Sequence, residues 1–153
     1  MNKSLAYFMR EALKEGRKAL PACLPNPPVG CVLVTGGVII ARGYTNPPGQ
    51  PHAEAMALRQ VHGPLHQVTA FVTLEPCAFY GRTPSCAVAL ITRRIHQVVV
   101  ALIDPHPQNQ GRGIQMLQDA GIPVTLSILQ DEAAKDMAAY LLKEATEPLE
   151  EWL

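Results

Sequence analysis

The residues best suited to chemistry are His52 and Glu54, two positions apart, and Cys77 and Cys86, nine positions apart. One imidazole and two thiolates make a set of three zinc ligands that leaves a fourth position for water. The carboxylate of Glu54 follows the imidazole closely enough to move protons beside that water instead of binding the metal. We therefore expect a zinc site with His52, Cys77 and Cys86 as ligands and Glu54 as the catalytic residue.

The same residues match the pattern His-x-Glu followed by Pro-Cys-x-x-Cys, which is typical of zinc nucleobase deaminases. The spacing differs, because eight residues instead of two separate Cys77 from Cys86. Zinc lowers the pKa of a bound water from about 15.7 to about 7, which makes hydroxide available at neutral pH. Attack of zinc-bound hydroxide would replace an exocyclic amine with oxygen, while Glu54 carries the proton to a ring nitrogen and helps protonate the departing amine.

A non-catalytic, zinc-stabilised module is the first alternative, and it would need a fourth protein ligand. The candidates for that ligand are Cys23, Cys31, His62 and His66. None has a convincing spacing, since Cys31 falls within an expected strand and Cys23 within a proline-rich loop. A structural site also has no use for the carboxylate of Glu54, so a catalytic zinc site is the preferred interpretation.

Length and composition predict one compact domain over residues 1–153, and the residues above make it a zinc-dependent deaminase domain. Thirteen basic and thirteen acidic residues cancel, which counts against the second alternative, a nucleic-acid editing deaminase. No apolar run reaches the roughly 18 residues that span a bilayer, and the N-terminus lacks a signal-peptide core. We therefore expect a cytoplasmic protein whose partners are small molecules, with no nucleic acid and no membrane, and whose cysteines are thiols.

The elements that must position these residues alternate along the chain. We expect helices over 4–20, 53–61, 87–92, 114–120 and 130–145, and strands over 29–35, 38–44, 68–74, 97–103 and 122–129. Gly36-Gly37 between two β-branched runs predicts a hairpin, and Ser85 is the expected cap of the third helix. His52 and Cys86 then lie at two helix N-termini, where one metal can bind both. The alternation predicts an α/β domain with a mixed sheet.

Longer stretches resemble one family. These are 26–34, 51–55, 73–77, 80–84 with Cys86, 99–101 followed by Asp104-Pro105, and 111–113 leading to 120–122. They resemble the deaminase domain of the bifunctional riboflavin-pathway deaminase/reductase, and the cysteine spacing is the most specific shared feature. The resemblance implies a cytidine-deaminase-like, three-layer α-β-α sandwich with a mixed five-stranded sheet. It implies a homo-oligomer, either dimer or tetramer. Because the chain stops soon after the last helix, we expect a stand-alone deaminase without the reductase domain.

The resemblance also implies which residues bind the substrate. Asn26, Arg82 and Asp104 fall on positions that line the family's substrate pocket. The family substrate is a phosphorylated ribosylamino-pyrimidine that loses an amine from its ring. On sequence alone, Asn26 could equally be a turn residue, and Arg82 a solvated loop residue in place of an anion contact.

Three positions depart from the family pattern at the end of the pocket that faces the sugar and phosphate. Phe79 replaces a histidine, Thr45 stands where a histidine is common, and His106 stands where an asparagine is common. Phe79 in place of the histidine removes a side chain that could bind phosphate and adds an apolar surface on which a ring could stack. We count Phe79 and His106 among the substrate-binding residues and expect another amino-heterocycle, either a pyrimidine or a related ring, as substrate. The alternative is the riboflavin-pathway diaminohydroxyphosphoribosylaminopyrimidine itself.

Overall fold

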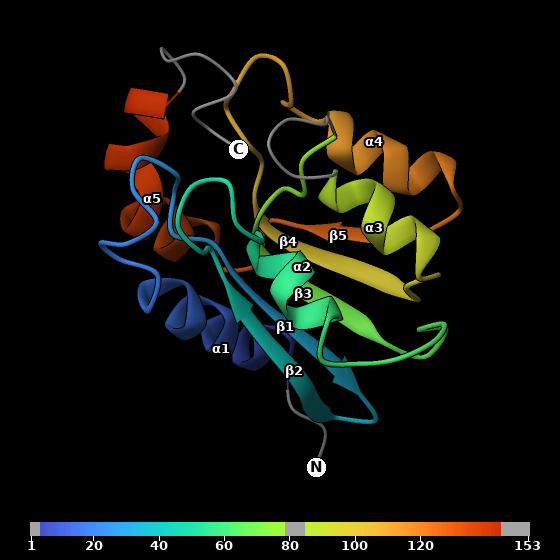
Figure 1. Ribbon diagram of the computed structural model, residues 1–153. Helices are drawn as coiled ribbons and strands as arrows, with labels where there is room; N and C mark the ends of the chain where they lie inside the picture. Colours follow the sequence, from blue (N-terminus) through green and yellow to red (C-terminus); the bar gives the residue numbers. More distant parts are fainter. Residues whose placement is uncertain (1–3, 79–84, 145–153) are drawn as a thin grey trace.

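The computed structural model describes residues 4–78 and 85–144, in which helices and strands alternate as the sequence predicts (Figure 1). The helices are α1 (Leu5–Arg17), α2 (Ala53–Leu58), α3 (Cys86–Thr92), α4 (Arg112–Asp119) and α5 (Gln130–Glu144). The strands are β1 (Gly30–Thr35), β2 (Val38–Tyr44), β3 (Thr69–Leu74), β4 (Gln97–Leu102) and β5 (Val124–Leu126).

The five strands form one mixed sheet in the order β2-β1-β3-β4-β5. The pairs β1–β2 and β1–β3 are antiparallel, whereas β3–β4 and β4–β5 are parallel. Helices α1 and α5 cover one face of the sheet, and α2, α3 and α4 cover the other (Figure 1). A contiguous cluster of buried apolar side chains runs through the central strands and the inner sides of the helices. The predicted α/β sandwich with a mixed five-stranded sheet is confirmed.

Three glycines, two in a turn and one in β2, shape the hairpin on which α2 packs. Gly36 and Gly37 have φ values of +56° and +78°, the left-handed conformation that a tight turn between twisted strands requires. They close the predicted hairpin of β1 and β2. At Gly43 in β2, an added Cβ would lie 2.1 Å from the carbonyl oxygen of Ala53, so the first turn of α2 rests directly on the strand backbone. This contact sets the depth at which α2 presents its N-terminal residues.

Some element boundaries differ from the prediction. Helix α2 ends at Leu58 instead of at residue 61, and the Arg93 guanidinium donates to the carbonyl oxygens of Leu58, Val61 and Gly63 that follow or close the last turn. Strand β5 has three residues, because the chain then turns through Ser127 at φ +67°. None of the helices in the described ranges is both long and apolar enough to cross a membrane.

Candidate metal centre and active-site pocket

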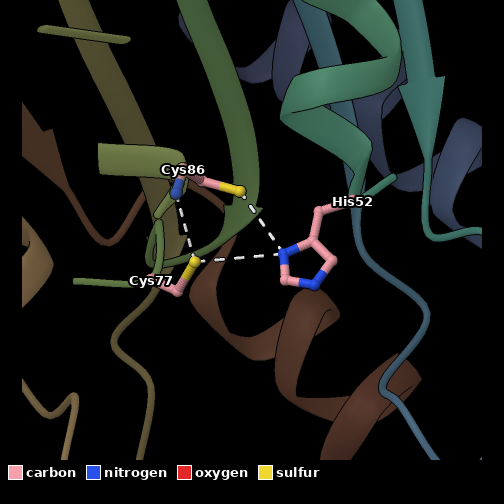
Figure 2. A group of neighbouring side chains, drawn as sticks. All are labelled: His52, Cys77 and Cys86. Carbon is pink, nitrogen blue, oxygen red and sulfur yellow. Dashed lines mark hydrogen bonds between the residues drawn. The ribbon is translucent and has the colours of Figure 1, made fainter. Parts of the chain in front are cut away.

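The three predicted metal ligands come from three elements and meet in space. His52 is the N-terminal cap of α2, Cys77 follows β3, and Cys86 is the first residue of α3. Figure 2 shows the His52 Nδ1 atom facing both sulfurs, 3.3 Å from Cys86 Sγ and 3.9 Å from Cys77 Sγ. Within the ranges that the structure describes, this is the one group of His, Cys, Asp and Glu side chains close enough to hold a metal ion.

Local hydrogen bonds hold the two cysteines together. The Ser85 hydroxyl caps α3 by accepting from the Val88 N–H at 3.2 Å, as predicted, and it donates to the Cys77 carbonyl oxygen at 2.8 Å. The Cys86 N–H in turn donates to Cys77 Sγ at 3.2 Å. The loop between the cysteines is therefore closed at its base, and Cys77 is held against the N-terminus of α3, where Cys86 lies.

The donor set fits zinc in its chemistry and spacing. Tetrahedral coordination at about 2.0–2.3 Å places ligand atoms roughly 3.5 Å apart, close to the two distances from His52 Nδ1. The pKa of the Cys77 thiol lies well below its usual range, because the Cys86 side chain hydrogen-bonds to it and His52 adds a second bond. A thiolate is thus already favoured at this position, and thiolates are the form that binds zinc.

Glu54 lies in the first turn of α2, beside the three ligands, and its side chain is 4 % exposed. Burial raises the pKa of its carboxyl group to about 7, and the neighbouring Cys77 contributes in the same direction. A carboxyl group with a pKa near neutrality can accept a proton in one step of a reaction and return it in the next. Glu54 therefore has the location and the acidity of a proton carrier.

A pocket opens in front of these residues. Its walls are formed by Asn26, Pro27, Val29, Thr45, His52, Glu54, Leu74, Glu75, Cys77 and Asp104. The structure thus brings two predicted substrate contacts, Asn26 and Asp104, to the same cavity as Glu54. The predicted contacts Phe79 and Arg82 lie outside the described residues.

Asp104 follows β4, and its carboxylate organises the loop after the strand. Its Oδ1 accepts from the His106 N–H at 2.9 Å, and its Oδ2 accepts from Asn109 Nδ2 at 3.0 Å. Burial raises the pKa of Asp104 to about 7. His106 is buried but is not among the residues of the pocket wall; its Nδ1 accepts from the Gln108 N–H at 3.2 Å, and burial lowers its pKa. His106 therefore contributes to the turn, and Asp104 presents the carboxyl group of this loop to the pocket.

Comparison with known proteins places the site in a family. The family model described as the cytidine and deoxycytidylate deaminase zinc-binding region matches residues 2–102. The chain belongs to this deaminase family. It is 48% identical over 134 residues to the riboflavin biosynthesis protein RibD of Haemophilus influenzae, which covers 88% of this chain and 36% of that protein. RibD of Escherichia coli is 43% identical over 140 residues, covering 92% of this chain and 38% of that protein. The chain thus spans little more than a third of these relatives.

Solved structures confirm the predicted deaminase fold. RibD of Acinetobacter baumannii superposes with a TM-score of 0.88 at 45% identity, covering 92% of this deaminase chain and 40% of that one. The Thermotoga maritima diaminohydroxyphosphoribosylaminopyrimidine deaminase/5-amino-6-(5-phosphoribosylamino)uracil reductase gives 0.83 at 38% identity, covering 91% and 41%. A cyanophage dCMP deaminase shares the fold at 23% identity, with a TM-score of 0.62 over 82% of this chain and 99% of that one. The predicted resemblance to the riboflavin-pathway deaminase domain is confirmed.

Two residues of the pocket wall have roles that the sequence did not reveal. The Thr45 hydroxyl donates to the Pro27 carbonyl oxygen and accepts from the Val29 N–H, both at 3.0 Å, so it fastens the loop before β1. Glu75 is 3 % exposed and accepts hydrogen bonds from the N–H groups of Gly111, the N-cap of α4, and Ile114 in its first turn. The available signal for Glu75 was a carboxylate directly after an apolar strand. Its partners lie too far along the chain for the sequence to identify them.

Proposed function

We propose that this deaminase-family chain is a zinc-dependent hydrolytic deaminase of an amino-substituted pyrimidine or related heterocycle. The observation that carries the proposal is the buried Glu54 carboxyl group, which shares a pocket with His52 and Cys77. These two side chains and Cys86 lie within metal-binding distance of one another. When bound by His52, Cys77 and Cys86, zinc supplies the Lewis acidity that makes a water nucleophilic at neutral pH. Such a pocket has no purpose in a structural zinc site.

Glu54 carries the protons of the reaction. It takes one from the attacking water, delivers it to a ring nitrogen, and then helps protonate the departing amine so that ammonia leaves. Its pKa of about 7 suits both directions of transfer at neutral pH. The apolar wall formed by Pro27, Val29 and Leu74 would exclude bulk water from a flat ring bound next to Glu54.

The polar part of the described wall favours a ring rich in hydrogen-bond donors. Besides Glu75, whose carboxylate accepts from backbone N–H groups, it contains the carboxyl groups of Glu54 and Asp104. No Lys or Arg side chain stands among the wall residues that the structure describes. Carboxylates accept hydrogen bonds from exocyclic amines and ring N–H groups. This wall favours an aminopyrimidine over a polyanion such as nucleic acid, whose binding depends on basic side chains.

The riboflavin-pathway aminopyrimidine is the second candidate, and the identities of 45–48% to RibD proteins favour it. One contact favours a different ring. Thr45 stands where a histidine is common in the family. Its hydroxyl group is hydrogen-bonded to the backbone of the loop before β1, and it carries no positive charge that could bind a phosphate. The two candidates therefore differ in whether the substrate is phosphorylated.

An ammonia-release screen separates these possibilities. Zinc-loaded protein is offered free aminopyrimidines, their nucleosides and the phosphorylated pathway intermediate, with zinc content measured in the same samples. We expect release from at least one aminopyrimidine, loss of release on chelation and recovery when zinc is restored. Turnover of the pathway intermediate at about 1 s⁻¹ or faster would establish the second candidate. No release from any ring by fully zinc-loaded protein would contradict the proposal.

We also propose that the protein is a homo-oligomer, either a dimer or a tetramer. A hollow between α2 and α3 supports this, because Leu58, Val88 and two alanines line it beside Arg59 and Arg93, a mixture of apolar and arginine side chains that suits an interface. Light scattering coupled to size exclusion should give at least twice the mass of one chain. The mass of a single chain at micromolar concentration would contradict this proposal and leave the deaminase proposal unaffected.

A further inference from the structure

The segment 104–114 runs from the end of β4 into the first turn of α4 and contributes Asp104 to the pocket. Helix α4 follows Gly111, which adopts φ +80° and has no side chain that could cap the helix. The N–H groups in the first turn of any helix lack partners within the helix. In α4, therefore, a group from elsewhere in the chain must accept hydrogen bonds from them.

That group is the carboxylate of Glu75, at the end of β3. Its Oε1 accepts from the Gly111 N–H at 3.0 Å, and its Oε2 accepts from the Ile114 N–H at 3.1 Å. Oε1 also accepts from the Asp104 N–H at 3.1 Å. A buried negative charge at a helix N-terminus is stabilised by these donors and by the helix dipole. The side chain that directly follows β3 thus holds both ends of the segment 104–114.

The same segment touches the chain on both sides of Cys77. A Cβ added to Gly113 would lie 1.9 Å from the carbonyl oxygen of Pro76, so the backbone of α4 packs directly on the residue before the metal ligand. On the other side, Asn109 Oδ1 accepts from the Ala78 N–H at 3.0 Å. The position of Cys77 therefore depends on the start of α4 as well as on β3.

We propose that Glu75 is a positioning residue that fixes the metal ligand Cys77 relative to Asp104 on the pocket wall. The carboxylate binds three backbone N–H groups of the segment 104–114, and this favours a positioning role over direct contact with substrate. The part of this proposal in which Asp104 contacts the substrate ring rests on the proposed function. The hydrogen bonds themselves do not, so the role of Glu75 is testable without turnover.

The variant Glu75→Gln tests the proposal at nearly constant volume. The amide offers one acceptor oxygen, and its NH₂ group must face an N–H donor, so at least one bond to the segment is lost. In zinc-loaded protein we expect the amide hydrogens of Gly111 and Ile114 to exchange roughly tenfold faster or more. Zinc affinity, measured against a competing chelator, should fall roughly 10- to 100-fold, as should kcat/KM for any substrate found.

Glu15→Gln is the matched control. Glu15 is 4 % exposed, and its carboxylate pairs with Lys18 at the end of α1 at 2.5 Å, on the opposite face of the sheet. It should leave zinc affinity and exchange in α4 unchanged. If Glu75→Gln does not fold, Glu75→Asp takes its place, because it keeps the charge but reaches one methylene less far. Its effects on exchange and zinc affinity should have the same sign and smaller size.

Unchanged exchange at Gly111 and Ile114 together with unchanged zinc affinity would overturn the proposal. A raised KM with both of those readouts unchanged would also overturn it, because Glu75 would then be a substrate contact. If the wild-type protein deaminates no ring, the proposed function fails, while exchange and zinc affinity still decide the role of Glu75.

Discussion

Glu54 and Glu75 are two buried carboxyl groups in the wall of one pocket, and their surroundings differ. Burial is the main cause of a raised pKa in both. For Glu75, hydrogen bonds from backbone N–H groups of the segment 104–114 oppose that rise, whereas for Glu54 the neighbouring Cys77 adds to it and the pKa reaches about 7. The comparison indicates that backbone donors oppose protonation of Glu75, whereas the pKa of Glu54 allows it to exchange a proton near neutral pH.

The helices beside these two residues show the same contrast. Neither α2 nor α4 is capped by a side chain of its own N-cap residue: His52 makes no such bond, and Gly111 has no side chain. At α4, Glu75 takes the place of the cap and locks the helix to β3. At α2, the imidazole of His52 is instead directed at the two thiols. The uncapped N-terminus of α4 thus anchors the helix to the chain after β3, whereas the uncapped N-terminus of α2 places a candidate metal ligand.

Of the substitutions considered, Glu54→Gln should have the largest effect, because it removes the proton carrier and leaves the hydrogen bonds of Glu75 in place. We expect turnover to fall by about 10²–10⁴-fold, because the amide cannot carry a proton. Zinc content should be unchanged, and the free energy of unfolding should stay equal or rise, because a buried ionisable group has been removed. Steady-state kinetics, metal analysis and urea unfolding provide the three measurements. A Glu54→Gln variant with near-normal turnover would make Glu54 structural, like Glu75.

Gly113→Ala tests the contact between α4 and the metal loop. Alanine favours a helix over glycine by about 1 kcal/mol, so propensity alone predicts stabilisation. The added Cβ would meet the Pro76 carbonyl oxygen, and we expect this clash to prevail with a loss of about 1–3 kcal/mol in the free energy of unfolding. Gln118→Ala, at an exposed position of the same helix, should change stability by less than about 0.5 kcal/mol. Stabilisation by Gly113→Ala would show that the helix is not pressed onto Pro76.

Asp104→Asn tests the pocket wall through the pH dependence of stability. Burial raises the folded-state pKa of Asp104 to about 7, above the value of about 3.9 in an unfolded chain. The folded protein then retains a proton that the unfolded chain releases, so the contribution of Asp104 to stability falls as pH rises from about 4 to about 7. The free energy of unfolding of Asp104→Asn, minus that of wild type, should therefore increase across this window and level off above it. Parallel pH profiles of the two proteins would contradict the raised pKa.

The sequence predicted those features whose physical cause is local. The hairpin follows from Gly36 and Gly37, which can adopt positive φ, and the start of α3 follows from the Ser85 cap. The ligands His52, Cys77 and Cys86 were found from residue type and spacing, although only the fold brings their atoms together.

What the sequence did not predict depends on partners far apart in the chain. Glu75 binds N–H groups 29 to 39 positions away, and nothing near it in sequence indicates them. Helix α2 ends earlier than predicted, where the Arg93 side chain, 35 positions further along the chain, donates a hydrogen bond to the Leu58 carbonyl oxygen. In the sequence, Thr45 was notable only because it departs from a family pattern. Its hydrogen bond with the Val29 N–H depends on the pairing of β2 with β1, which only the structure shows. Long-range pairing of polar groups is therefore the part that required the structure.

The most direct test of the central claim is the source of the oxygen in the product. A substrate found in the ammonia-release screen is incubated with zinc-loaded protein in water enriched in ¹⁸O, and the product is analysed by mass spectrometry. Hydrolytic deamination predicts one solvent oxygen on the ring carbon that lost its amine, with one ammonia released for each labelled product. A product that forms without solvent oxygen would contradict the account.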